Sequence, residues 1–265
     1  MPTGRWVGWS RAGASSGVVV ALLLVTLDGC SLDTLSAPIR SNDEVADDGS
    51  WVVLDLQNVL LRQAQSGATF YRALTGTPSF EVGVLRRQAG ALDPPIEHPN
   101  STMYRFLTGS GVVVTAADSV PFEPGHVFFI REGVEHRIVR GASVVDVLVV
   151  FSLGPASPAD PEFAAFAAEE LVSGRDDERN VFIDLVDASS MRLGMYLIPK
   201  NGDDPFVREH PYDELKIVIE GGGRFDIGNG GLEAEPGTIA YITSGTPHQF
   251  RRTSDALDVI VVGAN

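Results

Sequence analysis

Short runs of apolar residues separated by glycine-rich turns dominate the second half of this chain. Four such runs, rich in valine and isoleucine, occupy residues 182–186, 216–219, 239–242 and 257–262. Glycine clusters at 221–223 and 228–231 lie between the second and third runs. Many short strands with regular turns are typical of a β-sandwich or β-barrel. The pattern therefore predicts an all-β protein.

The chain also contains an internal repeat. The segment EHPNSTMYRFLTGSG begins at Glu97 and EHPYDELKIVIEGGG begins at Glu209, an offset of 112 residues. At the same offset, EPGHVFFIREGVEH pairs with EPGTIAYITSGTPH, and residues 97–140 and 209–252 are identical at twelve of 44 positions without a gap. Most of the shared residues are turn formers and histidines. A repeat of this kind indicates two copies of one frame, each with a site at the same place.

Upstream of these segments we expect the offset to change. The triplet Leu54-Asp55-Leu56 resembles Ile183-Asp184-Leu185 at an offset of 129, which predicts 17 extra residues in the first copy, between Gln57 and Val82.

Between the copies, the sequence predicts a helix. Asp160 is a suitable N-cap, Pro161 is a suitable first helical residue, and the helix is expected to run to about Val172. This helix would either link the two units or pack on the edge of the first one.

The N-terminal 30 residues have the composition of an export signal. Arg5 and Arg11 precede an apolar run over residues 18–27, which is too short to span a bilayer as a helix but fits a secretory signal. The run ends in Leu27-Asp28-Gly29-Cys30, which resembles the lipobox of bacterial lipoproteins, although an aspartate replaces a small uncharged residue. The resemblance implies that residues 1–29 are a signal peptide and that Cys30 is lipidated. The alternative is a plain signal peptide with an incidental cysteine.

The composition limits the classes of binding partner and the cellular location that we expect for this protein. Cys30 is the only cysteine, which excludes an internal disulfide framework, and residues 30–50 read as a flexible acidic tether. The chain has 265 residues and a formal net charge of −15. An acidic surface repels nucleic acid and anionic lipid head groups, so we expect no nucleic-acid partner and no membrane contact beyond the lipid. The expected location is the periplasmic side of a bacterial membrane or the cell surface.

The repeated motifs resemble those of the cupin superfamily. That family's first motif has a His-x-His pair followed by a glutamate and a glycine, and its second motif has a Pro-Gly or Pro-x-Gly followed by a histidine. The matches here are His210, Glu214, Gly221, Pro236, Gly237 and His248, whereas Arg208 stands in place of the first histidine. The resemblance implies two tandem jelly-roll β-barrels, over residues 51–153 and 180–265. A linker over residues 154–179 with a short helix would join them.

Strand geometry explains why these residues could form one site. Residues two apart on a strand face the same way, so positions 208 and 210 both point into the barrel, and a returning strand brings Glu214 beside His210. With His248 from a distant strand, two imidazoles and one carboxylate suit one divalent ion such as Fe(II) or Mn(II), with positions left open for substrate. The alternative is that His210 and His248 are half-buried polar residues of a retained fold.

The first copy has a poorer set. His98 and His136 are present, but Thr102 replaces the glutamate and Ile96 fills the position of the first histidine. Two imidazoles without a carboxylate hold a metal weakly. We therefore expect the first barrel to be structural or regulatory, without a metal of its own.

Three further residues are candidate ligand contacts. Arg208 and Lys216 share the strand parity of the predicted metal ligands and would suit an anionic substrate, as would Tyr241 in the same barrel. The alternative for the two cations is that they extend to solvent. The same parity would turn Leu215 and Ile217 outward, where the other barrel or a partner subunit could cover them, which leaves a homodimer open.

Two functions remain in competition. The first is a metal-dependent enzyme of the dioxygenase, decarboxylase or isomerase type that acts on a small anionic molecule. The second is a non-catalytic lipoprotein that binds a small ligand. Cupins include both, so the fold does not decide between them.

Overall fold

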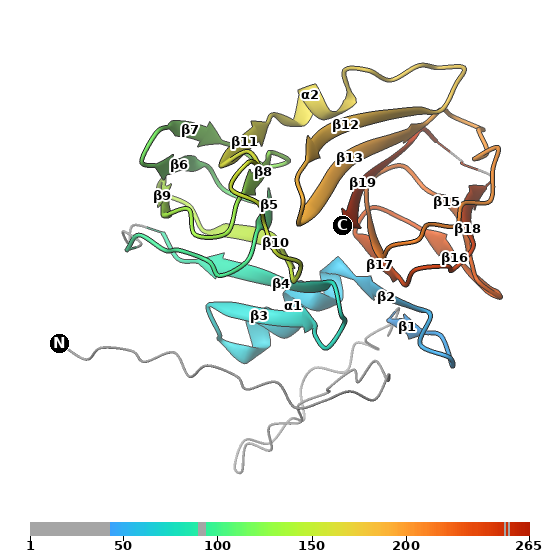
Figure 1. Cartoon of the computed structure of the whole chain (residues 1–265), viewed down its shortest axis with the longest axis horizontal. Helices are drawn as coiled ribbons and strands as arrows, with labels where there is room; N and C mark the ends of the chain where they lie inside the picture. Colours follow the sequence, from blue (N-terminus) through green and yellow to red (C-terminus); the bar gives the residue numbers. More distant parts are fainter. Residues whose placement is uncertain (1–42, 90–93, 252, 254) are drawn as a thin grey trace, which may run out of the picture.

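The structure of the chain is a computed structural model that describes residues 43–89, 94–251, 253 and 255–265 (Figure 1). The predicted signal peptide, the predicted lipidation site Cys30 and most of the predicted tether lie outside these residues. No helix within the described part of the chain is both long enough and apolar enough to cross a bilayer.

Strands dominate both halves, and all of the strand pairs in the described residues are antiparallel. The elements of the first half are β1 (Glu44–Val45), β2 (Trp51–Asp55), α1 (Leu56–Ser66), β3 (Phe70–Leu74), β4 (Phe80–Arg87), β5 (Thr102–Phe106), β6 (Gly111–Thr115), β7 (Ser119–Phe122), β8 (Val127–Ile130), β9 (His136–Arg140) and β10 (Val145–Ser152). Those of the second half are β11 (Phe163–Phe166), α2 (Ala168–Val172), β12 (Val181–Asp187), β13 (Met191–Ile198), β14 (Glu214–Glu220), β15 (Gly223–Ile227), β16 (Gly230–Ala234), β17 (Thr238–Ile242), β18 (His248–Arg251) and β19 (Leu257–Ala264).

Each half builds a jelly-roll barrel from one large sheet and one three-stranded sheet (Figure 1). In the first barrel the strand orders are β11-β8-β5-β10-β4-β3 and β7-β6-β9. In the second barrel they are β1-β2-β17-β14-β19-β13-β12 and β16-β15-β18. The predicted all-β fold class is confirmed, and the sheets fall into two barrels as the repeat indicated.

Each half contributes N-terminal strand structure to the other barrel: β1 and β2 join the second barrel, and β11 joins the first. β2 precedes the first barrel in sequence but pairs with β17 of the second, with Trp51 opposite Ile242. β11 precedes the second barrel but pairs with β8 of the first, with Phe163 opposite Ile130. The predicted boundary at residue 51 therefore assigns β2 to the wrong sheet.

The linker differs from the predicted helix over residues 161–172. Residues 163–166 form β11, and only Ala168–Val172 are helical, as α2. The edge of β8 supplies backbone partners to this segment, and such tertiary pairing overrides local helix propensity. Asp160 does not cap a helix: its carboxylate accepts hydrogen bonds from the backbone and hydroxyl of Ser189 and from the backbone of Ser157.

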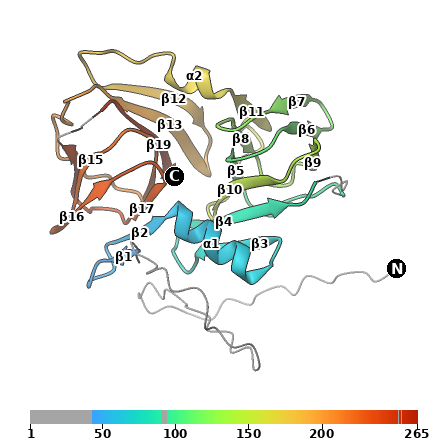
Figure 2. The ribbon, with the colours of Figure 1, turned by 180° about the vertical axis from the view of Figure 1, so that it is seen from behind.

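The predicted 17-residue insertion in the first copy is absent. The elements of the two halves can be matched in chain order, from β2 with β11 to β10 with β19. The first residues of each matched pair are 111 or 112 positions apart. Asp55 ends β2 and caps α1 by accepting a hydrogen bond from the backbone of Asn58, whereas Asp184 lies inside β12. The matching triplets therefore belong to different elements. α1 packs against β3 and β4 (Figure 2).

The predicted tether also ends earlier than residue 50. β1 pairs with β2, with Glu44 opposite Val53, and Asp43 forms an ion pair with Arg62 of α1 at 2.5 Å. These contacts attach residues 43–45 to the fold.

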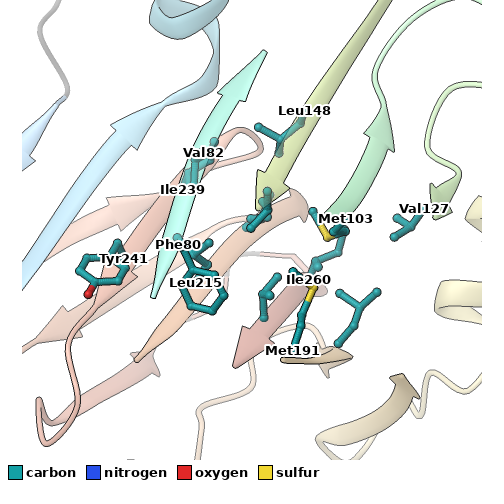
Figure 3. Close-up of a cluster of buried hydrophobic side chains, with 14 of the residues drawn as sticks. Phe80, Val82, Met103, Val127, Leu148, Met191, Leu215, Ile239, Tyr241 and Ile260 are labelled. Carbon is teal, nitrogen blue, oxygen red and sulfur yellow. The ribbon is translucent and has the colours of Figure 1, made fainter. Parts of the chain in front are cut away.

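The main hydrophobic core lies between the two large sheets (Figure 3). Alternate residues of the central strands face opposite ways, so in β10 Val147 points into the first barrel while Leu148 joins the shared core. In β14, Leu215 and Ile217 point into this shared core, opposite residues such as Phe80 and Val82 of the first half. The outward apolar stripe of β14 is thus covered by the other barrel.

Candidate metal centre

The backbone of the second barrel brings three predicted ligands to one point. Arg208 and His248 form an isolated antiparallel bridge, in which each backbone N–H donates to the other's carbonyl at 2.9 Å. This bridge fixes the segment that carries His210 beside β18, which starts at His248. Glu214 is the first residue of β14, which lies in the middle of the large sheet. Glu214 and His248 therefore lie at paired strand positions, and His210 lies two residues after the bridge, where its carbonyl accepts a hydrogen bond from the backbone of Gly245.

The side chains converge as the sequence predicts. The Nε2 atom of His210 lies 3.6 Å from Oε1 of Glu214, and the Nε2 atom of His248 lies 3.2 Å from Oε2. The three candidate ligand atoms all lie within 4.8 Å of one another. Glu214 and His248 are buried, whereas His210 is partly exposed. One side of the cluster is therefore open to a ligand.

The hydrogen bonds of His248 reveal which of its nitrogens faces the carboxylate. Its Nδ1 atom lies 3.0 Å from the carbonyl oxygen of Thr246, which can only accept, so Nδ1 carries the proton. The Nε2 atom then presents a lone pair to Glu214. Within the described residues, Nε2 of His248 and Oε2 of Glu214 are buried atoms without a hydrogen-bond partner.

Two buried acceptors 3.2 Å apart repel each other unless a cation or a proton lies between them. A backbone carbonyl that orients the imidazole from its far side is the usual second-shell arrangement of a metal-bound histidine. The donor set and its orientation therefore fit a divalent metal ion.

Lys216 adds a cation that the sequence did not place at this carboxylate. Its ammonium is almost fully buried and lies 3.1 Å from Oε2 of Glu214. Burial by itself would raise the pKa of Glu214, but the ammonium and the two imidazoles lower it to about 2. Burial lowers the pKa of His210, and the positive charges of Lys216 and Arg208 lower it further, against the opposing effect of Glu214. The carboxylate is thus ionised, and His210 is kept available as a neutral ligand.

Arg208 lies at the site but already has partners. Its guanidinium forms an ion pair with the buried Asp204 at 3.1 Å, and it donates a 3.3 Å hydrogen bond to the hydroxyl of Tyr196. It also lies over the Tyr196 ring, 5.0 Å from the centroid. These contacts hold the guanidinium at the pocket wall, with 35% of the side chain exposed.

A pocket of about 150 Å³ opens from this cluster. Its lining includes the predicted contacts Arg208 and Lys216 and the predicted ligands His210 and Glu214. Tyr241 is not part of it. This side chain points into the shared core between the barrels, and its hydroxyl donates a 2.6 Å hydrogen bond to Asp213 (Figure 3). The predicted substrate contact Tyr241 therefore does not line this pocket, because its strand parity is opposite to that of the pocket.

The first barrel has a phenol at the centre of the equivalent cluster. Tyr104, the counterpart of Lys216, is fully buried, and its hydroxyl lies 2.6 Å from Nε2 of His98 and 3.0 Å from Nε2 of His136. The Nδ1 atom of His136 donates to the carbonyl of Val134, so its Nε2 accepts the phenol proton and His98 donates to the phenol oxygen. Thr102 turns its hydroxyl to the carbonyl of Asn100.

Sequence reasoning missed this role of Tyr104, although the offset of 112 pairs it with Lys216. Burial and the neighbouring His136 lower the pKa of His98 to about 4, and burial raises the pKa of the phenol. The cluster is therefore neutral near pH 7 and internally satisfied. These contacts engage the imidazole nitrogens that a metal would need, and the absence of a metal from the first barrel stays a prediction.

Comparisons with known proteins agree with the fold. Residues 194–263, which contain all three predicted ligands, match the family model Cupin_2, described as "Cupin domain". No curated protein matches the sequence.

Solved structures resemble the chain over most of its length. The cupin 2 conserved barrel domain protein from Leptotrichia buccalis has a TM-score of 0.59 and 14% identity, and the match covers 74% of this chain and 88% of that chain. Salicylate 1,2-dioxygenase from Pseudaminobacter salicylatoxidans has a TM-score of 0.66 and 13% identity, with coverage of 80% and 83%. At such identities the likeness shows the fold alone. The second barrel thus matches a cupin-domain model, and the chain shares the fold of these solved structures.

Proposed function

We propose that the second barrel binds one divalent metal ion, such as Fe(II) or Mn(II), through His210, Glu214 and His248. The observation that carries this proposal is the close approach of two buried acceptor atoms, Nε2 of His248 and Oε2 of Glu214, which lie 3.2 Å apart. The Lys216 ammonium pairs with Oε2, but no group of the described residues satisfies Nε2. A cation between them would remove their repulsion and satisfy both atoms.

The charges around the pocket favour an anionic ligand for this centre. Arg208 and Lys216 are each paired with a carboxylate, Asp204 and Glu214, so these four groups are neutral in sum. A divalent ion would make the site positive. A small organic anion would offset part of this charge at the one partly exposed side of the cluster, next to His210.

A bound metal of this type would act as a Lewis acid toward a substrate oxygen and could support redox chemistry. Around it, His210 and His248 supply neutral nitrogen donors, Glu214 supplies charge, and the buried walls exclude water. We propose a metal-dependent reaction of the dioxygenase, decarboxylase or isomerase type on a small anionic molecule. The similarity in fold to a salicylate 1,2-dioxygenase supports the oxidative alternative.

A specific observation favours a second candidate, a metal-free protein that binds a small anion. The Lys216 ammonium already compensates the Glu214 charge at 3.1 Å. In this case Lys216 and Arg208 would bind the ligand directly, without catalysis.

One set of measurements separates the two candidates. The purified full chain is loaded with Mn(II), or with Fe(II) without oxygen, and its metal content is determined. We expect one ion per chain, lost in His210→Ala, Glu214→Ala and His248→Ala and retained in the matched first-barrel variants His98→Ala and His136→Ala. An absence of metal under both loading conditions would contradict the metal site and favour the second candidate.

Replacement of Lys216 by Met sharpens the distinction. In a metal site, removal of a cation that lies near the bound ion should raise the metal affinity by about tenfold or more. In a metal-free anion site, the same change should abolish anion binding, and metal affinity would stay negligible.

We also propose that the protein is exported and attached to a bacterial membrane through lipidated Cys30. The supporting observation is the lipobox-like segment that ends the apolar run.

A further inference from the structure

The partly exposed ligand His210 is held in a different way from the buried ligand His248. The Nδ1 atom of His248 lies 3.0 Å from the carbonyl oxygen of Thr246, and this hydrogen bond orients the imidazole. Within the described residues, no hydrogen bond reaches the imidazole of His210, whose Nε2 atom lies 3.6 Å from Glu214, too far for one. A metal-bound histidine usually has a partner that orients its ring. If His210 binds a metal, another contact has to orient it.

The ring of Tyr212 makes such a contact. It lies nearly parallel to the imidazole of His210, with centroids 5.1 Å apart and ring planes inclined by 17°. Offset stacking of this kind is a favourable arrangement of two flat rings, and it acts on the face of the imidazole. The lone pair of Nε2 lies in the plane of the imidazole. The stack therefore restrains the ring and leaves Nε2 of His210 free to face Glu214 and a metal ion.

The backbone and a glycine hold Tyr212 in this place. The carbonyl of Asp213 accepts a hydrogen bond from the backbone of Ala264 at 2.9 Å, which attaches the turn before β14 to the end of β19. The Tyr212 ring then fills the space above Gly263, where a Cβ atom would come within 3.2 Å of it. A large side chain at position 263 would compete with the ring for this space. The glycine therefore admits Tyr212 to the wall of the site.

The first barrel also packs an aromatic ring on the equivalent histidine, but the ring comes from a different position. Phe151 lies 112 positions before Gly263, and it pairs with Thr102 as Gly263 pairs with Glu214. The Phe151 ring lies edge-on to the imidazole of His98, with centroids 5.1 Å apart and ring planes inclined by 70°. Each barrel thus places one such ring at the same distance from this histidine, from the strand in one case and from the turn in the other.

The two histidines differ in how their nitrogens are used. The Nε2 atom of His98 lies 2.6 Å from the hydroxyl of Tyr104, so a hydrogen bond already orients that ring. The first barrel has Asn100 where the second has Tyr212, and the described rings around His98 are all inclined to it by 50° or more. Face-to-face stacking is thus found on His210, whose Nε2 has no hydrogen bond, and not on His98.

We propose that Tyr212 is a positioning residue of the metal centre, whose ring fixes the plane of the His210 imidazole so that Nε2 is directed at the metal ion. The inference rests on the proposed metal site. An imidazole that is already fixed loses less conformational freedom when the ion binds, so the ion binds more tightly. The flat face of the Tyr212 ring performs this role, and its hydroxyl is not required.

Mn(II) titration of the full chain and of three variants at position 212 tests this role. Tyr212→Ala and Tyr212→Leu remove the flat ring and should weaken Mn(II) binding by about tenfold. Tyr212→Phe keeps the ring without its hydroxyl and should bind Mn(II) as the unmodified chain does. Phe151→Leu alters the ring at the equivalent histidine of the first barrel. It is the matched control and should leave the affinity unchanged.

Electron spin-echo spectroscopy of the Mn(II)-loaded samples gives a second readout. It detects nitrogen atoms bound to the ion, and we expect the signal of two imidazoles in the unmodified chain and in Tyr212→Phe. In Tyr212→Ala and Tyr212→Leu the contribution of His210 should weaken. A ring that serves only the stability of the fold would not change this signal.

Unchanged Mn(II) affinity and an unchanged nitrogen signal in Tyr212→Ala or Tyr212→Leu would overturn the proposal. An equal loss in Tyr212→Phe would also overturn it, because the hydroxyl and not the ring would then be responsible. The leucine variant decides the question even if the alanine variant does not fold. An unmodified chain that binds no Mn(II) is a different failure, which would contradict the proposed metal site and this inference with it.

Discussion

The hydroxyl of Ser79 in the first half donates a 2.7 Å hydrogen bond to the carboxylate of Asp213 in the second half. The same carboxylate accepts hydrogen bonds from the hydroxyl of Tyr241 and from the backbone of Ser244. Asp213 immediately precedes Glu214. The turn that delivers the candidate metal carboxylate is therefore anchored to the other barrel.

Removal of this anchor should destabilise the fold. Asp213→Ala leaves the Ser79 and Tyr241 hydroxyls without their acceptor, and we expect the free energy of unfolding to fall by about 2–4 kcal/mol. Ser79→Ala and Tyr241→Phe each remove one donor and should cost about 1 kcal/mol. Urea denaturation of the full chain measures these changes. Tyr241→Phe should also leave ligand binding intact, and a large loss of ligand affinity in that variant would restore Tyr241 as a substrate contact.

The first barrel should make stability depend on pH. The pKa of His98 is about 4 in the fold, below its ordinary value of 6.5, because the imidazole is buried and lies near His136. The unfolded chain therefore binds this proton more readily. The stabilisation is complete above about pH 6.5 and is lost as the pH falls through about 4, by up to about 3 kcal/mol.

The pH dependence is measured by urea unfolding between pH 4 and pH 7. His98→Gln should flatten the profile in that range, whereas His126→Gln, which changes an imidazole outside this cluster, should not. A profile that stays unchanged in His98→Gln would show that the acid sensitivity arises elsewhere.

Cleavage of the chain between the barrels should not separate them. A protease site placed at the exposed residues 177–178 would leave β2 in the first fragment, still paired with β17 of the second, and both fragments would share the core between the large sheets. We expect the cut fragments to co-elute in size-exclusion chromatography and to retain their β-sheet spectrum. Two separate, folded fragments would contradict this description of the interface.

The membrane anchor has a direct test. Cys30→Ser removes the thiol that lipidation requires, so the variant should leave the membrane fraction and appear in the soluble exported fraction. Immunoblots of fractionated bacterial cells that express the full chain measure this. A variant that stays with the membrane would indicate that the apolar run over residues 18–27 is retained instead.

The repeat explains why much of the site could be predicted from sequence. His210, Glu214 and His248 lie in segments whose offset is constant, and turn residues and ligands together define a barrel frame. Strand parity also predicted that Arg208 and Lys216 would share a pocket with the ligands. These inferences rely on local geometry, which short strands follow closely.

The remaining features depend on tertiary contacts that a sequence does not display. Residues 163–166 became β11 because the edge of β8 was available, and β2 pairs with a strand almost two hundred positions away. The hydrogen bonds of Tyr104 to both imidazoles could have been suspected from its offset to Lys216, but only the packing shows them. Tyr241 faces the shared core because it lies opposite Leu215 in the pairing of β17 with β14, a register that the sequence does not display.

The exchange of β2 and β11 bears on how the gene for this chain can evolve. Two equal barrels that swap their first strands have the architecture of a symmetric dimer whose subunits have been fused end to end. A truncated gene without the first repeat would leave the β17 edge unpaired and the shared core open to water, and such edges promote aggregation. The first barrel therefore serves as a scaffold for the second, although it lacks the carboxylate ligand.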